Sequence, residues 1–337
     1  MTDASALVDA YDAALFDLDG VVYLGPVAVP GAAEGIAELR RRGCTVGFVT
    51  NNAARSPRVV AEHLVELGIE AAPADVVTSA QAAAHVLSSR FGAGAKILVV
   101  GGEGVLDALA EAGLVAVRSA DDEPVAVIQG FGLELAWQEL NEAAIAINRG
   151  AVWVATNDDP TRPTDRGLVP GNGAAVAAVG FAVSVTPEVA GKPYRPLLDD
   201  TVARLEATRP IFVGDRLDTD IAGARNAGLD SLLVLSGSHG PADLLGAPTG
   251  SRPDHLGHDL TALLHPARRA RAEGAGWLVD GVTARVDQGR LTLGGTSADS
   301  LAALWASAQA CWDAADRGEP VDLEAALATL SDEGGAG

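Results

Sequence analysis

Lysine is nearly absent from this chain of 337 residues, which has only Lys96 and Lys192 against 22 arginines. Basic charge is scarce as a whole, because 24 lysines and arginines face 45 aspartates and glutamates and leave a net charge of −21. Nucleic acids and anionic membranes require a basic surface, so we expect neither as a partner. An anionic substrate would need local positive charge, from a metal ion, an arginine, a lysine or a helix N-terminus. Because Arg and Lys are not interchangeable, the two lysines mark candidate positions where arginine does not serve.

Cysteine and long apolar runs are scarce as well. Cys44 and Cys311 lie far apart and provide neither a disulfide framework nor the spacing of a metal site. The first residues lack the basic stretch followed by an apolar one that marks a signal peptide, and no apolar run approaches the roughly 20 residues of a membrane span. We therefore expect a cytoplasmic protein with two reduced thiols.

What the sequence does contain is apolar material in a regular alternation. Hydrophobic residues make up 48% of the chain, enough for a real core, and the length allows two domains. Apolar segments rich in β-formers alternate with Ala/Leu/Arg-rich segments of helical period, the pattern of a parallel sheet with crossover helices. This pattern predicts strands over 14–20, 45–52, 210–215 and 231–237, and helices over 31–43, 56–68 and 220–228.

Residues 82–187 carry a second alternation of the same kind. We predict that they form an α/β cap domain inserted into a catalytic core made of residues 1–81 and 188–265, and such a module could close over a site. The pattern predicts strands over 96–102, 124–131, 151–157 and 181–185, and helices over 104–113, 135–150 and 172–180.

Residues 266–337 differ in texture and form a predicted C-terminal appendix. The pattern predicts a basic helix over 267–276, a hairpin over 282–295 that turns at 287–289, a helix over 296–318 capped at Thr296 or Ser297, a short helix over 322–330 and a frayed tail. The long helix has a plausible buried stripe, and the appendix is too small for a large core of its own. We expect it to pack on the main body or on a second subunit. The stripe consists of Leu301, Leu304, Trp305, Ala308 and Trp312.

Two aspartates follow the first apolar run. In ALFDLDG, one residue separates Asp17 from Asp19, and the period of two in a strand places both side chains on one face. Like charges this close raise each other's pKa and cost stability unless something positive lies between them. A Mg²⁺ ion, which takes few carboxylates together with water and phosphate oxygens, would remove the repulsion. Taken alone, a DxD is more often a solvated turn.

Three further segments combine a strand or helix edge with polar residues. VTNN (49–52) offers a hydroxyl and amides, GKP (191–193) carries one of the two lysines, and VGDRLDTDIAGARNAG (213–228) ends a strand in Gly-Asp and adds two acids before a helix. In parallel sheets, ligands bind beyond the carboxyl ends of the strands, so these segments could meet there. Each alone fits a polar turn or cap, but the series of four is hard to explain by turns.

The series D-x-D-G, V-T-N-N, G-K-P and G-D-R-x-x-T-D resembles the motifs of the haloacid dehalogenase superfamily. It looks like the branch with p-nitrophenyl phosphatases, NagD-type nucleotidases, and phosphatases of phosphoglycolate, glycerol 3-phosphate and pyridoxal phosphate. Residues 155–179 also resemble the cap of that branch. The resemblance covers residues 10–260 and implies an α/β fold with a Rossmann-like doubly wound parallel-sheet core and an inserted α/β cap. The small α+β appendix lies outside it.

The resemblance also implies roles for the acidic residues. Asp17 would be the nucleophile that forms an aspartyl-phosphate, and Asp19 would protonate the leaving alkoxide and then activate water. Mg²⁺ is the implied cofactor. It would be bound by the Asp17 carboxylate, the Asp19 main-chain carbonyl and Asp215, with Asp220 close behind.

Phosphoryl binding is implied for residues of the other motifs. Thr50, Asn51 and Asn52 would hold phosphoryl oxygens and Lys192 would neutralise them, while Gly20 would let backbone N–H groups approach. These roles fit phosphoryl transfer, which depends on positioning and on charge stabilisation.

The sequence thus predicts a Mg²⁺-dependent phosphatase of a small phosphomonoester, with glycerol 3-phosphate and 2-phosphoglycolate as favoured substrates. Sugar phosphates, nucleotides and pyridoxal phosphate stay open, because cap contacts that motifs do not reveal set selectivity. A receiver-like signalling module and a scaffold on the phosphatase fold are the alternatives from other classes. A homo-oligomer formed through the cap or the appendix also stays open.

Overall fold

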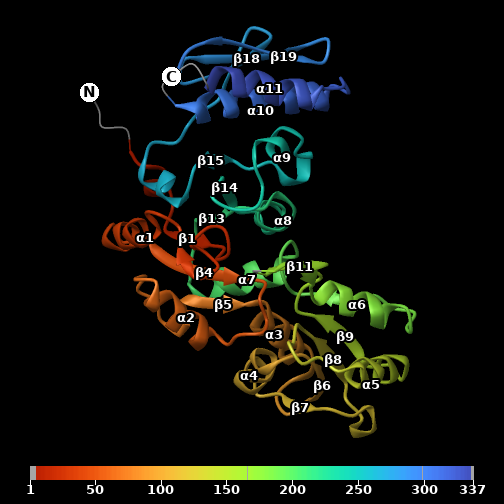
Figure 1. Cartoon of the computed structure of the whole chain (residues 1–337). Helices are drawn as coiled ribbons and strands as arrows, with labels where there is room; N and C mark the ends of the chain where they lie inside the picture. Colours follow the sequence, from red (N-terminus) through yellow and green to blue (C-terminus); the bar gives the residue numbers. More distant parts are fainter. Residues whose placement is uncertain (1–4, 165, 298, 335–337) are drawn as a thin grey trace. The chain divides into compact units, whose positions relative to one another are not determined.

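The computed structural model describes residues 5–164, 166–297 and 299–334, and the chain divides into two compact units (Figure 1). The first unit consists of Met1–Val46 and Thr208–Gly337, and the second consists of Gly47–Ala207. Among the described residues, no helix combines the length and the apolar character that crossing a membrane requires. The three-part division at residues 81, 187 and 265 stays a prediction.

Parallel strands with flanking helices build the main part of the first unit. The strands run in the order β15-β14-β13-β1, and each neighbouring pair is parallel. The elements up to residue 264 are η1 (Leu7–Ala10), β1 (Ala13–Phe16), β2 (Tyr23–Leu24), β3 (Val27–Ala28), α1 (Ala32–Arg41), β13 (Pro210–Gly214), the π-helical turn η4 (Leu217–Ile221), α8 (Ala222–Ala227), β14 (Asp230–Val234), α9 (Pro241–Leu245), η5 (Thr249–Ser251), β15 (His255–Gly257) and η6 (Leu260–Leu264).

Local sequence accounts for these elements. All four residues of β1 are buried, as expected for a strand covered on both faces. Helix α1 follows Gly31, whose φ of 82° suits glycine, and it buries Ala32, Ile36 and Leu39 at helical spacing.

The second unit contains a parallel sheet of its own, in the order β12-β9-β8-β6-β7. Strand β4 (Thr45–Thr50) begins in the first unit and continues into the second, where it pairs in parallel with β5. The remaining elements are α2 (Pro57–Glu66), η2 (Pro73–Asp75), β5 (Val76–Thr78), α3 (Ser79–Phe91), β6 (Lys96–Val100), α4 (Glu103–Glu111), β7 (Val115–Val117), η3 (Ala120–Asp122), β8 (Ala126–Gln129), α5 (Trp137–Asn148), β9 (Val152–Ala155), β10 (Thr161–Thr164), β11 (Gly167–Pro170), α6 (Asn172–Gly180), β12 (Glu188–Val189) and α7 (Arg195–Arg204).

The predicted α/β fold with Rossmann-like parallel sheets is confirmed, but one strand of the second unit is wrong. Residues 181–185 form a turn after α6 instead of a strand, and the strand β12 begins only at Glu188. The N–H of Phe181 still bonds to the Ala177 carbonyl in the last turn of the helix, and the Phe181 side chain is 94% exposed. A short apolar run does not by itself distinguish strand from turn.

The C-terminal residues of the first unit form a four-stranded antiparallel sheet, β16-β17-β18-β19, with α10 and α11 packed against it (Figure 1). Its core is continuous with that of the parallel sheet, since Leu233, Leu244 and Leu256 lie in one buried cluster with the residues of α10. The predicted packing on the main body and the predicted buried stripe are therefore confirmed. The elements are β16 (Arg271–Glu273), β17 (Gly276–Val279), β18 (Val282–Asp287), β19 (Arg290–Gly295), α10 (Ser300–Asp316) and α11 (Leu323–Gly334).

Three details of this part differ from expectation. The predicted basic helix over 267–276 is wrong, since β16 pairs there with β17 across a turn at Gly274, whose φ is 60°; tertiary pairing overrides weak helix propensity. The cap of α10 is Asp299, which accepts a hydrogen bond from the N–H of Leu301, and not Thr296 or Ser297. Helix α11 extends to Gly334, so the tail is shorter than predicted, and residues 335–337 lie outside the described part.

Candidate active site

Two of the predicted acidic residues directly follow paired strands of the first unit. Strand β1 ends at Phe16 and β13 ends at Gly214, so Asp17 and Asp215 are the next residues of two neighbouring parallel strands. The N–H of Asp17 donates to the carbonyl of Val213, 2.9 Å away, which continues the pairing one residue further. Because both strands end at the same edge of the sheet, the two carboxylates are brought together despite their distance in sequence.

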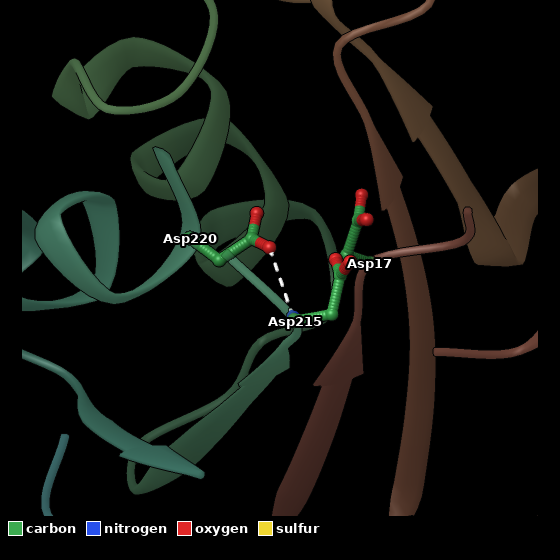
Figure 2. Close-up of side chains that lie close together, drawn as sticks. All are labelled: Asp17, Asp215 and Asp220. Carbon is green, nitrogen blue, oxygen red and sulfur yellow. Dashed lines mark hydrogen bonds between the residues drawn. The ribbon is translucent and has the colours of Figure 1, made fainter. Parts of the chain in front are cut away.

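Asp17, Asp215 and Asp220 form one carboxylate cluster, in which one oxygen of each lies within 4.8 Å of the others (Figure 2). Asp215 and Asp220 are buried, with 0% and 1% exposed, and Asp17 is half-buried. Three carboxylates this close repel one another unless a cation or protons lie between them. Oxygen donors from carboxylates are what Mg²⁺ and other hard cations prefer, so the donor set fits a divalent cation.

Glycines form the wall around this carboxylate cluster. A Cβ at Gly20 would lie 2.4 Å from Oδ2 of Asp215, and a Cβ at Gly237 would lie 2.1 Å from the same oxygen. At Gly214, a Cβ would lie 2.2 Å from the Cβ of Asp220. Side chains at these positions would occupy the space of the carboxylates, so the backbone itself approaches them closely.

Backbone N–H groups fix the two buried acids in place. Oδ2 of Asp220 accepts from the N–H of Asp215 at 3.1 Å (Figure 2). The same oxygen accepts from the N–H of Arg216, also at 3.1 Å, and Asp220 itself lies in the π-helical turn η4. Oδ2 of Asp215 accepts from the N–H of Ser238 at 2.6 Å. Asp220 therefore orients the segment that carries Asp215. The Asp215 carboxylate is also oriented by the N–H of Ser238, in the loop after β14.

Asp19 and Gly20 lie in the turn after β1, where Asp19 forms a bridge with Tyr23 and the N–H of Gly20 donates to the Tyr23 carbonyl. Strand β1 ends before either DxD aspartate, so the strand periodicity used to place them on one face does not apply. The Asp19 side chain is exposed, in contrast to Asp17. It is not among the three clustered carboxylates, and its predicted metal ligand is a main-chain carbonyl.

Apart from Gly20, the predicted phosphoryl-binding residues lie in the second unit. Thr50 is the last residue of β4 and is buried, and its Oγ1 accepts from the N–H of Asn52 at 3.0 Å. Lys192 is only 2% exposed, which is rare for lysine. Asn51 joins these segments, because its side chain bonds to the main chain of Lys192. Exposed Asn52 accepts from the N–H of Ala54 through its own side chain.

Several site neighbours carried little signal in the sequence. His239 lies in none of the four motifs, yet its backbone N–H donates to the Asp215 carbonyl and its Nδ1 accepts from the N–H of Leu217. Asn157 and Asp159 were missed, although both bond to Asn51. The segment NDDP follows strand β9 after one residue, Thr156, and that position at a strand end was the available signal.

One charged pair of the fourth motif is accounted for without a catalytic role. Burial by itself would raise the pKa of Asp218, but hydrogen bonds and charge from Arg216 outweigh it and lower that pKa. Asp218 is exposed and thus remains an anion paired with Arg216.

Comparison with known proteins identifies the family of this chain. The family described as haloacid dehalogenase-like hydrolase matches residues 14–115, and a related HAD hydrolase family matches residues 189–263. A D-glycerol 3-phosphate phosphatase of Mycobacterium tuberculosis is 46% identical over 276 residues, which cover 82% of this chain and 77% of that protein. This chain belongs to the haloacid dehalogenase-like hydrolase family.

Solved structures of family members agree with the fold. A glycerol phosphate phosphatase from Mycobacterium tuberculosis, in complex with magnesium, superposes with a TM-score of 0.84 at 42% identity over 92% of each chain. A p-nitrophenyl phosphatase from Archaeoglobus fulgidus gives a TM-score of 0.71 at 27% identity and covers 75% of this chain and 98% of its own. The family recognised from the four motifs is confirmed. The Mycobacterium tuberculosis structure covers 92% of this chain, so the similarity extends into the C-terminal appendix, which the motif resemblance did not include.

Proposed function

We propose that this haloacid dehalogenase-like hydrolase is a Mg²⁺-dependent phosphatase of a small phosphomonoester, with glycerol 3-phosphate as the first candidate substrate. The observation that carries the proposal is the cluster of Asp17, Asp215 and Asp220 on two of the family's motifs. The choice of glycerol 3-phosphate is supported by the 46% identity to a phosphatase of that substrate.

The covalent step begins at Asp17. A carboxylate oxygen of Asp17 forms a bond to phosphorus while the bond from phosphorus to the alcohol oxygen breaks, and Asp19 gives that oxygen a proton. Water then gives a proton to Asp19 and attacks phosphorus, and the bond to Asp17 breaks to release inorganic phosphate. The exposure of Asp19 suits a group that must exchange protons.

Asp17, the Asp19 carbonyl and Asp215 would hold Mg²⁺, and Asp220 would orient Asp215 through its N–H. When bound, the ion supplies positive charge that lets an anionic carboxylate approach an anionic phosphoryl group. The glycine wall at Gly20 and Gly237 supports this assignment, because it leaves room for oxygens and none for side chains.

Phosphoryl binding is proposed for the motif residues of the second unit. Thr50, Asn51 and Asn52 offer a hydroxyl and N–H groups, and buried Lys192 supplies the local positive charge that a chain of net charge −21 otherwise lacks. Gly20 keeps its proposed role of letting backbone N–H groups approach the phosphoryl group, and its φ of 93° is one that suits glycine.

The test measures phosphate release from glycerol 3-phosphate, 2-phosphoglycolate, sugar phosphates, a nucleoside monophosphate, pyridoxal phosphate and p-nitrophenyl phosphate, each with Mg²⁺ and with EDTA. We expect Mg²⁺-dependent release with the highest kcat/KM for glycerol 3-phosphate. Asp17→Asn should lower it by more than about 10³-fold, since the nucleophile is lost. Asp218→Asn is the matched control, because Asp218 is exposed, lies outside the carboxylate cluster and pairs with Arg216 and His239.

Full activity of Asp17→Asn, or equal activity in EDTA, would overturn the proposed mechanism. A phosphorylated Asp17 that persists for minutes would instead favour the receiver-like alternative. Another substrate at the top of the panel would replace glycerol 3-phosphate and leave the phosphatase assignment intact.

The proposed setting is the cytoplasm, where the free and buried Cys44 and Cys311 stay reduced. Burial raises the pKa of each thiol to about 11, so both are poor nucleophiles at neutral pH. The proposed partner is the small phosphate ester itself. Sedimentation of the full chain decides whether it acts as a homo-oligomer.

A further inference from the structure

The side chain of Asn51 forms hydrogen bonds with both main-chain polar groups of Lys192, its N–H and its carbonyl. Its Oδ1 accepts from the N–H of Lys192 at 2.8 Å, and its Nδ2 donates to the carbonyl of Lys192 at 3.0 Å. The same Nδ2 donates to Oδ2 of Asp159 at 3.2 Å. Both protons of the amide are thus already engaged within the second unit.

We propose that the Asn51 side chain is a positioning residue that holds Lys192, instead of a donor to the phosphoryl group. The proposal rests on the proposed function, in which Lys192 neutralises phosphoryl oxygens. It narrows the role that the motif implied for the Asn51 side chain.

The surroundings of Asn51 are shaped for this hold. A Cβ at Gly191 would lie 2.7 Å from Oδ1 of Asn51 and 2.6 Å from the Thr156 carbonyl, so the residue before Lys192 leaves the space that the amide needs. The backbone carbonyl of Asn51 accepts from Nδ2 of Asn157 at 2.8 Å and from the Ser79 hydroxyl at 2.7 Å. The backbone of Asn51 is therefore held by Asn157, which follows β9, and by Ser79 at the start of α3. These two bonds are independent of the bonds from the Asn51 side chain to Lys192.

Further bonds tie this hold to the sheet of the second unit. Nδ2 of Asn172, the first residue of α6, donates to the carbonyl of Asn157 at 2.7 Å and to that of Gln129 at 3.3 Å. Asn172 is 3% exposed and Asn157 is 4% exposed, so the hydrogen bonds are shielded from competing water. Lys192 is thus positioned by an amide network whose inner members, Asn157 and Asn172, are buried, in addition to the turn that the Tyr194 N–H closes on the Gly191 carbonyl.

An amide is the side chain that this position requires. Its separate oxygen and NH₂ group let it accept from an N–H and donate to the carbonyl of the same residue at once, as one peptide group does to another. Aspartate would accept from Lys192 but could not donate to its carbonyl, and it would add a second carboxylate beside Asp159. Alanine would leave both main-chain groups of a buried lysine without this partner.

Hydrogen exchange tests the hold directly, because the chain has only two lysines. Labelling with ¹⁵N-lysine gives two backbone amide signals, and Lys96→Arg assigns them by removing one. We expect Asn51→Ala to speed exchange of the Lys192 amide at least roughly 10-fold, in line with loss of about 1.4 kcal/mol of protection. The matched control is Asn148→Ala, which removes an exposed asparagine that donates to the Ala182 carbonyl.

Kinetics with Mg²⁺ test what the hold is for. Displacing Lys192 should lower kcat/KM of Asn51→Ala roughly 10- to 100-fold, as small misplacements of a binding group do. The factor should be the same for glycerol 3-phosphate and p-nitrophenyl phosphate, since both present the same phosphoryl group. Asn51→Asp should be as impaired, and adding Asp159→Asn should restore part of the activity by removing the carboxylate pair.

Unchanged exchange at Lys192 in Asn51→Ala would overturn the hold. Losses that differ between the two substrates, or a double variant no better than Asn51→Asp, would overturn the positioning role. No phosphate release by the wild type would refute the proposed function itself, and the exchange measurement would still decide whether Asn51 holds Lys192.

Discussion

At the scale of single residues, a glycine provides the space that the Asp215 carboxylate occupies. Gly237 follows the end of β14, and the next residue, Ser238, donates its N–H to Oδ2 of Asp215. The carboxylate lies against the Gly237 Cα because no side chain keeps it away. Here glycine serves close approach of backbone to a functional group, and not a turn conformation.

A methyl group at Gly237 should therefore act on the metal site. We expect Gly237→Ala to lower Mg²⁺ affinity and Mg²⁺-dependent activity roughly 10- to 100-fold, as changes behind metal ligands do, because the new Cβ would stand 2.1 Å from Oδ2 of Asp215. Calorimetric titration with Mg²⁺ measures the affinity without turnover.

Gly250→Ala is the control for that substitution. Gly250 lies in η5 of the same unit, and a Cβ there would meet nothing within 4 Å. Equal Mg²⁺ affinity in Gly237→Ala and Gly250→Ala would show that the carboxylate does not need the space.

At the scale of elements, the cap of α10 joins the helix to the loop before it. Asp299 accepts from the N–H of Leu301 and forms an ion pair with Arg268, which also pairs with Asp280. Burial alone would raise the pKa of Asp299, but the Leu301 N–H and Arg268 outweigh it and lower that pKa below its ordinary value of 3.8.

The lowered pKa predicts how the cap depends on pH. A depressed carboxyl pKa adds stability above the ordinary pKa, and that stability is lost as pH falls through the lower folded pKa. Asp299→Ala should cost about 1 kcal/mol of unfolding free energy at neutral pH, the usual value of an N-cap.

Urea unfolding of wild type and Asp299→Ala from about pH 7 to about pH 3 tests this pH dependence. The difference in unfolding free energy should stay constant down to the ordinary pKa of aspartate and shrink below it. A difference that grows in acid would contradict the assigned sign. Ser297→Ala is a useful comparison, because its hydroxyl accepts from the Asp299 N–H without capping the helix.

Elements are also where reasoning from sequence succeeded and failed. The Ser56–Pro57 signal placed the start of α2 correctly, and the hairpin turn formed at Gln288 and Gly289, whose φ values of 49° and 79° suit a tight turn. The predicted strand over 181–185 and the predicted helix over 267–276 were wrong. Their sequence patterns are short or weak, so contacts with neighbouring elements determined the structure of these segments. Local signals prevail where a cap or a turn residue specifies the backbone.

At the scale of the whole first unit, the appendix completes a core instead of adding a separate one. Trp305 and Trp312 of α10 pack edge to face with ring centroids 5.5 Å apart, and the indole N–H of Trp312 donates to the carbonyl of Leu244 in α9. Removing residues 266–337 would expose the apolar side chains of α9 and β15 that this helix covers.

A single substitution tests this shared core. Trp305 is 3% exposed, so Trp305→Ala should lower the unfolding free energy of the first unit by roughly 3–5 kcal/mol. Trp137→Ala, at a tryptophan that is 70% exposed in the second unit, should change it little. Chemical denaturation followed by circular dichroism compares the two, and equal small losses would mean that the appendix core contributes little.

The sequence by itself determined the family, the alternation of strands and helices, and the identity of the acids and the lysine, because those depend on residue type and spacing along the chain. The tertiary structure decided that Asp220 holds the backbone of Asp215, that Gly237 makes room for its carboxylate, and that Asn51 bonds to Lys192. The physical reason is that hydrogen bonds and close contacts between residues far apart in the chain leave no periodic trace in it, and only the folded backbone brings such partners within bonding distance.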